Sequence, residues 1–317
     1  MSKKELIIGI DTSNYTTSVG IVDIDGNVVA NLKRPLPVKS GECGLRQSDA
    51  VFAHVKNLPE IMEVAGGIIN GAPILSVGVS EKPRNEEGSY MPCFLTGVGV
   101  AQGIAGACAV PLYRFSHQCG HIMAAIHSSG AVIDEGDEFA AFHVSGGTTE
   151  LVKVKACGNG FVTEIVGGSS DLNAGQAIDR IGVMMGLPFP AGAHMETLAL
   201  SNTQKIPKKK PSVAGTVASL SGLQNLAQRL YEQSGDKALV CAFTLDYVAN
   251  TLLMMRAGFE EVYGSSKFIF AGGVMSNSII KSKLSASGSY FSLPEFSADN
   301  AVGIALLARK AYLAENV

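Results

Sequence analysis

The sequence has no tryptophan, a small share of charged residues and no apolar run long enough to cross a bilayer. Charged residues make up only 17% of the 317 residues, and the formal net charge is −3. A chain with this balance has no overall electrostatic attraction for nucleic acid. Because a membrane-spanning helix needs about 20 consecutive apolar residues, we expect no transmembrane helix and no membrane partner.

Cysteine is present, but it lacks the spacing of a disulfide framework or of a paired-cysteine metal site. The sequence contains six cysteines and no Cys-x-x-Cys pair. They are Cys43, Cys93, Cys108, Cys119, Cys157 and Cys241. The start of the sequence also shows no signal-peptide pattern, and both features are typical of a reducing compartment. We therefore expect a cytoplasmic protein.

The remaining composition is that of a large globular protein. Apolar residues make up 46% of the chain, and a length of 317 residues predicts about two domains. Glycines gather in short clusters at the ends of expected strands, where ligands usually bind. Only residues 205–210 are locally basic, and this segment is either a solvated loop or a contact for RNA.

Apolar and alternating patterns in the first half predict three strands followed by alternating helices and strands. The expected elements are strands at 6–10, 17–24 and 28–32, a helix at 45–69, a strand at 74–79, a helix at 94–109 and a strand at 112–115. Pro59 lies inside the first helical pattern, where we expect it to kink or divide the helix. The polar segment 81–91 is expected to be a loop that can cover a site.

The second half repeats this order of elements. Strands are expected at 139–145, 149–155, 161–166, 268–271 and 290–293, and helices at 173–185, 220–233, 238–263, 276–286 and from about 299 to 314, with a break at 187–192. Two successive βββαβα units predict an internal duplication. The expected fold is α/β, with duplicated βββαβα domains of the actin, Hsp70 and sugar kinase (ASKHA) type around a nucleotide cleft. The first domain is expected to comprise residues 1–110 and 297–317, and the second residues 111–296.

Two local patterns are candidate sites. His117 and His121 stand four apart in a helical pattern, so their Cβ atoms lie about 5–6 Å apart on one face, which suits two ligands of one metal ion. The alternative is a helix with two partly buried histidines bonded to backbone carbonyls. Asp11, Thr12 and Ser13 form a polar turn after the first strand. Its hydroxyl and N–H groups can contact a phosphate, although hairpins carry the same residues for turn chemistry alone.

Five motifs resemble those of the TsaD (Gcp) family, formerly described as O-sialoglycoprotein endopeptidases. They are His-Gln-Cys-Gly-His at 117–121, Val-Ser-Gly-Gly-Thr-Thr-Glu-Leu at 144–151, Ser-Leu-Ser-Gly-Leu at 219–223, Ala-Gly-Gly-Val-Met-Ser-Asn at 271–277 and Ser-Ala-Asp-Asn at 297–300. They occur in the family's order, and the resemblance covers essentially the whole chain. It implies a metal- and nucleotide-dependent transferase of the tRNA N6-threonylcarbamoyladenosine synthase type. It also implies tRNA and family-related proteins as partners.

The resemblance also assigns binding residues. The family's metal ligands correspond to His117, His121 and Asp299; the family's metal is often iron, although these ligand types admit zinc equally. The second expected ligand is an adenine nucleotide or threonylcarbamoyl-adenylate. The positions that match the family's nucleotide contacts are His143, Val144, Ser145, Gly146, Gly147, Asp179, Gly192 and Asn277. Among these, the Asp179 carboxylate is expected to accept hydrogen bonds from the ribose hydroxyls.

The chain departs from the family pattern at several expected cleft positions. Tyr15 and Thr16 replace two acids of the family's first motif, Glu-Thr-Ser-Cys-Asp-Glu-Thr. Thr148 stands where the family has a histidine, Cys119 replaces a glutamate between the metal histidines, and Leu172 replaces another acid. These departures remove candidate catalytic groups, so the sequence assigns no catalytic residue. They indicate a divergent paralogue.

Two hypotheses about function remain open. The first is a threonylcarbamoyl transferase acting on tRNA, or a carbamoyl transferase acting on another acceptor. The second is a nucleotide-binding paralogue with a regulatory role. Proteolysis is disfavoured because Cys119 and Gly120 stand where a His-Glu-x-x-His protease carries its general base. The acceptor, the metal's identity and the oligomeric state do not follow from the sequence.

Overall fold

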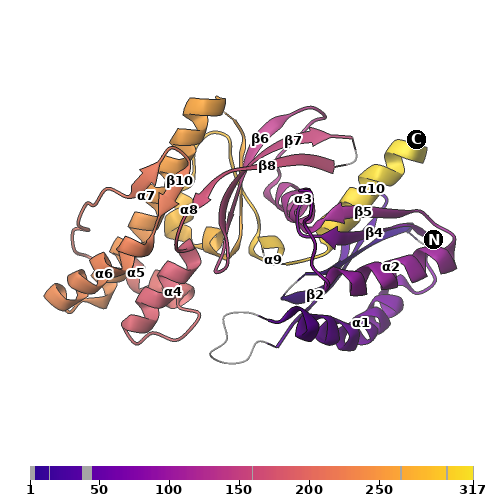
Figure 1. The fold of residues 1–317 in the computed structure, drawn as a ribbon, viewed down its shortest axis with the longest axis horizontal. Coiled ribbons are helices and arrows are strands. Elements are labelled where there is room, and N and C mark those ends of the chain that lie inside the picture. Colours follow the sequence, from indigo (N-terminus) through magenta and orange to yellow (C-terminus); the bar gives the residue numbers. More distant parts are fainter. Residues whose placement is uncertain are drawn as a thin grey trace.

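The chain folds into two lobes, each built on one β-sheet (Figure 1). The computed structural model describes residues 4–13, 15–37, 45–158, 160–264, 266–297 and 299–316. Within these residues the first sheet has five strands and the second has seven. Cys43 lies outside the described residues, and the other cysteines are free thiols.

The first sheet consists of an antiparallel meander and two strands added in parallel. In sheet order its strands are β3 (Val28–Pro35), β2 (Thr16–Asp23), β1 (Leu6–Thr12), β4 (Ile74–Lys82) and β5 (Leu112–Ser116). β1 pairs antiparallel with β2 and parallel with β4. Because β1 is central, every residue along it is buried, which explains the continuous apolar run at its start.

The second sheet repeats this topology. Its meander consists of β6 (Glu138–Val144), β7 (Thr149–Cys157) and β8 (Gly160–Ser169), and its added parallel strands are β11 (Phe268–Ala271) and β12 (Ser289–Phe291). The order β8-β7-β6-β11-β12 matches β3-β2-β1-β4-β5, with the same relative strand directions. The predicted duplication is therefore confirmed.

Helices α1 (Gln47–Ile69) and α2 (Phe94–Cys108) cover one face of the first sheet (Figure 1). Leu58, Ile61 and Ala101 share a buried core with apolar side chains of β1 and β2. α1 continues through Pro59 as one helix, so a division of the helix there is wrong, while the alternative of a kink stays a prediction. Burial of Leu58 and Ile61 against the sheet offsets the backbone hydrogen bond that a proline cannot make.

Helices α3 (His117–Ser129) and α10 (Val302–Asn316) pack against each other between the two sheets. α10 shares one core with β1 and β2, and α3 shares another with β6, β7 and β11. Ile304 and Leu307 of α10 also belong to the α3 core. At the crossing, a Cβ atom added to Gly303 would lie 1.9 Å from the Gly120 carbonyl oxygen. Only glycine fits such a close approach of two backbones.

The second lobe carries most of the remaining helices. They are α4 (Ala174–Met184), α5 (Gly192–Leu200), α6 (Ser221–Ser234), α7 (Lys237–Tyr263), η1 (Gly273–Ser276) and α8 (Ser278–Leu284), while α9 (Pro294–Ser297) lies between the lobes, with Phe296 in the core that α10 shares with β1 and β2. By length and composition alone, α7 is apolar enough to cross a membrane, but most of it is buried inside the protein. Its apolar side chains form the centre of this lobe's core, which is where a helix that is apolar all round belongs in a globular protein.

Two elements of the second lobe were not expected from the sequence. α5 directly follows the Pro-rich break at 187–192, and only Met195 and Ala199 of this helix are buried, so no periodic apolar pattern marks it. A short hairpin of β9 (Ser212–Ala214) and β10 (Val217–Ser219) extends the second sheet beside β8. Its strands of three residues are too short to show alternation.

Strand pairing bears on the expected domain boundary at residue 110. β5 pairs with β4 in the first sheet, so sheet membership extends the first domain to Ser116. α10 lies in the expected C-terminal part of the first domain, and it packs on the first sheet. The division into residues 1–110 plus 297–317 and residues 111–296 stays a prediction.

Candidate metal and nucleotide site

A cavity of about 410 Å³ is lined by residues of both lobes. The candidate residues that line it are Ser13, His117, His121, His143, Ser145, Gly147 and Asp299. The candidates outside its lining are Asp11, Thr12, Val144, Gly146, Asp179, Gly192 and Asn277. The cavity thus joins the expected metal ligands to the two turns that are expected to contact phosphate.

The end of β5 and the start of α3 place the two histidines. β5 ends at Ser116 and α3 begins at His117. Ser116 is the N-cap of α3, and its hydroxyl accepts a hydrogen bond from the Cys119 N–H at 3.3 Å, which satisfies a donor that the first turn leaves free. His117 and His121 then lie one turn apart, with ring centroids 4.3 Å apart.

Asp299 reaches the histidines from the segment between α9 and α10. Its Oδ1 atom lies 3.3 Å from His121 Nε2 and 3.7 Å from His117 Nε2, and the two Nε2 atoms are 2.9 Å apart. Ligand atoms bound about 2.1 Å from a tetrahedral metal ion are about 3.4 Å from one another. The triangle of donor atoms therefore has the size that one ion requires, and these residues form a candidate metal cluster within the described chain.

Asp11 is buried beside this cluster and fixes the orientation of His117. Asp11 Oδ2 lies 2.6 Å from His117 Nδ1, and Ser80 donates its hydroxyl to Asp11 Oδ1 at 2.7 Å. Burial alone would lower the pKa of His117, but the charge and hydrogen bond of Asp11 outweigh it and, with Asp299, raise the pKa to about 9. A carboxylate on one imidazole nitrogen leaves the other directed at a metal. Asp11 thus contacts a candidate metal ligand and does not line the cavity, and a phosphate contact by its turn stays a prediction.

The pKa shifts in the cluster keep Asp299 ionised and His143 neutral. Burial raises the pKa of Asp299, but the hydrogen bond from His121 and the charges of the histidines outweigh it and hold the pKa below its usual range. His143 lies beside His121, with ring centroids 4.9 Å apart. Burial and the charges of His121 and His117 lower the pKa of His143 to about 3. His143, which the sequence assigns to the nucleotide, therefore lies next to the candidate metal cluster.

The turn after β1 offers one free hydroxyl to the cavity. Ser13 is buried, and its Oγ atom has no hydrogen-bond partner among the described residues. Thr12 differs, because its hydroxyl donates to the Cys93 carbonyl at 3.0 Å and accepts from the Gly97 N–H at 3.1 Å. An unsatisfied buried hydroxyl costs about 1–3 kcal/mol. Ser13 is therefore the residue of this turn that is available to a ligand oxygen.

The turn after β6 gathers backbone N–H groups around the Ser145 hydroxyl. The N–H groups of Gly147 and Thr148 donate to Ser145 Oγ at 3.3 and 3.1 Å. Helix α4 begins directly beside this turn, where a Cβ atom added to Gly175 would lie 2.5 Å from the Ser145 carbonyl oxygen. Clustered N–H groups at the start of a helix are a common anion-binding arrangement.

Asp179, Gly192 and Asn277 lie on α4, α5 and the start of α8. Asp179 Oδ1 accepts a hydrogen bond from the Ala191 N–H at 2.8 Å, which brings Asp179 next to Gly192. Asn277 uses its side-chain oxygen to cap α8. The structure therefore brings Asp179 to the residue that precedes Gly192 and assigns Asn277 a capping contact.

Comparison with known proteins identifies the family. The chain matches the family described as tRNA N6-adenosine threonylcarbamoyltransferase (TsaD) over residues 48–306. The chain belongs to the TsaD family. A relative of that name from Streptococcus suis is 29% identical over 332 residues, covering 100% of this chain and 95% of the relative. Another from Methanopyrus kandleri is 26% identical over 307 residues, covering 95% of this chain and 86% of the relative.

Solved structures agree on the fold. Component A of (R)-2-hydroxyglutaryl-CoA dehydratase from Acidaminococcus fermentans matches with a TM-score of 0.57 and 15% identity, covering 97% of this chain and 99% of its own. A ROK family glucokinase from Streptomyces griseus matches with a TM-score of 0.52 and 14% identity, covering 96% of this chain and 99% of its own. Full-length HypF matches with a TM-score of 0.57 and 11% identity, covering 99% of this chain and 56% of its own. The ASKHA-type fold is confirmed.

The site of this TsaD family member contains charged residues that were not individually expected. Arg84, in the loop 81–91, lines the cavity and forms an ion pair with Glu150 of β7. Asn85 of the same loop donates its side-chain amide to the Phe161 carbonyl at 3.1 Å. A loop of the first lobe thus contacts the second lobe over the cavity. The polar composition of this loop predicted that it can cover a site, but nothing in the sequence predicts the ion pair of Arg84 with Glu150.

The departures from the TsaD motifs fall into two groups in the structure. Tyr15, Thr16 and Thr148 line the cavity, so the loss of acidic and histidine side chains changes its wall directly. Cys119 instead donates its thiol to the Phe161 carbonyl at 3.7 Å, and burial raises its pKa, so it is an inert core thiol. Leu172 belongs to the core of the second lobe. Only the first group alters the candidate site.

Proposed function

We propose that this protein is a metal- and nucleotide-dependent transferase that acts in threonylcarbamoyl modification of a tRNA adenosine. One observation carries the proposal: the donor atoms of His117, His121 and Asp299 converge in a cavity that Ser13 and the Ser145 turn also line. A metal next to two phosphate-binding turns suits transfer from an activated acyl-adenylate. The family of the chain supports the tRNA acceptor.

The metal would be held by His117, His121 and Asp299, because their donor atoms fit one ion in spacing and chemistry. Two imidazoles and one carboxylate leave coordination positions open and suit iron or zinc. When bound, such an ion polarises a carbonyl oxygen as a Lewis acid. Asp11 keeps the Nδ1 proton of His117 in place, so that Nε2 remains directed at the ion.

The nucleotide would bind across the cavity between the two turns. The Ser13 hydroxyl would donate a hydrogen bond to a phosphate or acyl oxygen. The N–H groups of Gly147 and Thr148 would do the same, by exchanging their present hydrogen bonds to Ser145 Oγ for bonds to the ligand. Asp179 supplies a carboxylate for the ribose hydroxyls. Arg84 of the loop lines the cavity and pairs with Glu150, so it would contribute a positive charge near the bound nucleotide. These roles are binding and positioning, and no residue is assigned as general base.

A regulatory or differently specific paralogue is the second candidate. Tyr15, Thr16 and Thr148 line the cavity where relatives of the TsaD type carry acids and a histidine. A binding scaffold without these groups suits a nucleotide-binding partner of another family member, or carbamoyl transfer to another acceptor. The two candidates agree on metal and nucleotide binding and differ only in whether tRNA is modified.

A transfer assay decides between them. The full chain, loaded with iron or with zinc, is incubated with threonylcarbamoyl-adenylate and unmodified tRNA, and the nucleosides are analysed by mass spectrometry. We expect modified adenosine with the wild type and a strong loss with Asp299→Ala, while Glu295→Ala in the same segment keeps the activity. If the wild type binds the nucleotide but forms no modified adenosine, the chain does not modify tRNA by itself, and the paralogue hypothesis is favoured.

A further inference from the structure

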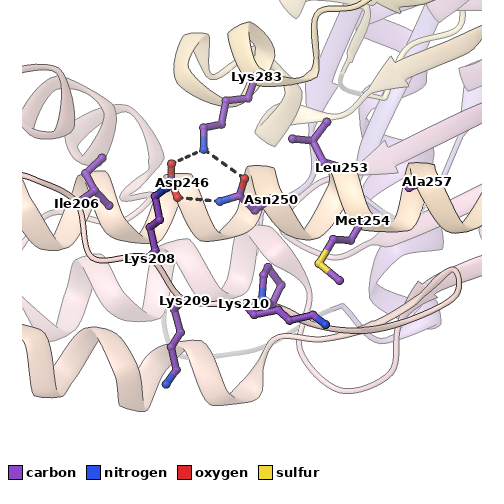
Figure 2. Close-up of a pocket in the computed structure, with 11 residues that line it drawn as sticks. Ile206, Lys208, Lys209, Lys210, Asp246, Asn250, Leu253, Met254, Ala257 and Lys283 are labelled. Atoms are coloured by element: carbon purple, nitrogen blue, oxygen red, sulfur yellow. Dashed lines mark hydrogen bonds and ion pairs between the residues drawn. The ribbon is translucent and has the colours of Figure 1, made fainter.

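A second pocket, of about 720 Å³, lies on the second lobe and shares no lining residue with the cavity between the lobes. Figure 2 shows its lining residues. Helix α7 contributes an apolar side that includes Leu253, Met254 and Ala257. The lining also includes four lysines, which we name the lysine rim: Lys208, Lys209 and Lys210 of the segment before β9, and Lys283 of α8, which extends toward Asp246.

Three residues of the lysine rim lie between two prolines, in a segment without helix or strand. Pro207 and Pro211 flank Lys208, Lys209 and Lys210, and no helix or strand forms in this segment before β9. Proline fixes its own backbone and restricts the residue that precedes it. The three lysines are all exposed. A segment whose backbone is already restricted loses less conformational entropy when it binds a ligand.

The charge of the lysine rim is only partly neutralised. Lys283 pairs with Asp246 and donates to Asn250 at 3.3 Å, and Asn250 donates to Asp246 at 2.8 Å (Figure 2). No ion pair joins Lys208, Lys209 or Lys210 to an acidic residue in the part of the chain that the structure describes. Three adjacent positive charges therefore remain on a protein whose formal net charge is −3. Such a local concentration attracts an anionic polymer that the protein as a whole does not.

We propose that the lysine rim binds the phosphate backbone of the RNA acceptor; this inference rests on the proposed function, which requires a tRNA. Lysine ammonium groups bind phosphates as point charges, and phosphate contacts position a nucleic acid without reading its sequence. The polar groups of Asp246 and Asn250 are occupied by Lys283 and by each other. The rim therefore contributes affinity and orientation but no base recognition.

The test compares two triple variants of equal charge. The rim variant carries Lys208→Ser, Lys209→Ser and Lys210→Ser. The control variant carries Lys56→Ser, Lys155→Ser and Lys310→Ser, three lysines elsewhere on the protein. Binding of labelled unmodified tRNA to each full-length protein is measured over a series of salt concentrations, and thermal unfolding confirms that each variant is folded.

We expect the rim variant to bind tRNA about tenfold more weakly than the wild type at low salt. The slope of log K against log salt should also decrease in magnitude by about 2–3, because each lost phosphate contact removes nearly one unit. The control variant should stay within about twofold of the wild type. Equal loss in both variants overturns the inference, because only net charge would then matter. Absence of tRNA binding by the wild type at low salt overturns it too.

The outcomes separate this inference from the proposed function. Wild type that binds tRNA through the rim but transfers no threonylcarbamoyl group upholds the lysine rim and refutes the transferase. If the wild type modifies tRNA and the rim variant binds tRNA as tightly as the wild type, the transferase is upheld and the role of the lysine rim is refuted. Binding of polyglutamate at the rim without binding of RNA also refutes the inference and indicates an acidic protein partner instead.

Discussion

Asp11 Oδ2 and His117 Nδ1 lie 2.6 Å apart, and this contact ties the first strand of the chain to the first residue of the metal helix. Asp11 is anchored in turn by the Ser80 hydroxyl from β4. Two parallel strands of the first sheet thus determine which nitrogen His117 presents to the cavity. The candidate metal cluster therefore has a buried carboxylate, that of Asp11, as a support for one of its histidines.

Asp11→Asn should lower metal affinity about 10–100-fold, which is the usual effect of removing such a supporting group. The amide can donate to Nδ1 and so favour the tautomer with the proton on Nε2, where the metal must bind. Titration against a competing chelator measures the effect. Asp23→Asn, which alters another buried carboxylate of the first sheet, is the control and should leave metal affinity unchanged. Equal affinity of Asp11→Asn and wild type would refute the supporting role.

Asp299→Ala should reduce bound metal from about one equivalent to well below one, because two imidazoles alone hold an ion weakly. Elemental analysis after dialysis measures the stoichiometry. His121→Ala should behave in the same way. Glu295→Ala changes an exposed acid four residues away and should retain one equivalent. A full equivalent of metal in Asp299→Ala would remove this residue from the ligand set.

Asp179→Ala should weaken adenine nucleotide binding several-fold, since the carboxylate is expected to accept two ribose hydroxyls. Burial raises the pKa of Asp179, but its contact with the Ala191 N–H opposes the shift. Calorimetry gives the affinity, and thermal unfolding shows whether the lost Ala191 contact has destabilised the fold. An unchanged affinity in a folded variant would show that the ribose does not contact Asp179.

Asp171→Ala should destabilise the second lobe by about 1 kcal/mol, because hydrogen bonds to a charged group are lost but solvent screens the charge of this exposed carboxylate. The carboxylate accepts from the Ser219 hydroxyl at 2.6 Å and from the Leu220 N–H at 2.8 Å. Burial raises the pKa of Asp171, but these hydrogen bonds, together with those from Ser221 and Leu172, outweigh it and place the pKa below its usual range. Urea unfolding measures the loss, and the exposed Asp25→Ala is the control.

The effect of Asp171→Ala should depend on pH in one direction. The folded-state pKa of Asp171 lies below the unfolded value of about 3.9. The contribution of Asp171 to the free energy of unfolding is therefore complete above about pH 3.9 and declines as the pH falls toward the folded-state pKa. The stability difference between wild type and variant should therefore be largest near neutrality and smaller near pH 2.5. A constant difference over this range would show that the ionised form is not what stabilises the lobe.

Local patterns account for much of what could be predicted from the sequence. The strands of both sheets carry apolar or alternating runs, and His117 and His121 are neighbours because a helix brings positions four apart together. Asp299 has no local relation to them, and only the resemblance to a family placed it in the same site. The role of Asp11 could not be predicted, because a polar residue after a strand is equally consistent with turn chemistry.

Contacts between distant segments account for what was missed. The pair Arg84 and Glu150 joins a loop of one lobe to a strand of the other, and no periodicity relates the two positions. α5 was missed because few of its side chains are buried, and the division at Pro59 was wrong because tertiary packing outweighs local propensity. The burial of side chains that follow a regular period along a helix or strand can be predicted from the sequence. Contacts between side chains of different lobes cannot, because no local pattern relates the two positions.

The close crossing of α3 and α10 has a consequence for how the protein unfolds. Proteins with two sheets in two lobes commonly lose structure in separate steps. Here Ile304 and Leu307 of α10, a helix that packs on the first sheet, complete a core of the second lobe. α10 therefore contributes to one core in each lobe, while the cores around α7 and beneath α1 and α2 contain no residue of this helix. Denaturation should accordingly couple the two lobes through α10, and removal of α10 should expose apolar surface in both halves at once.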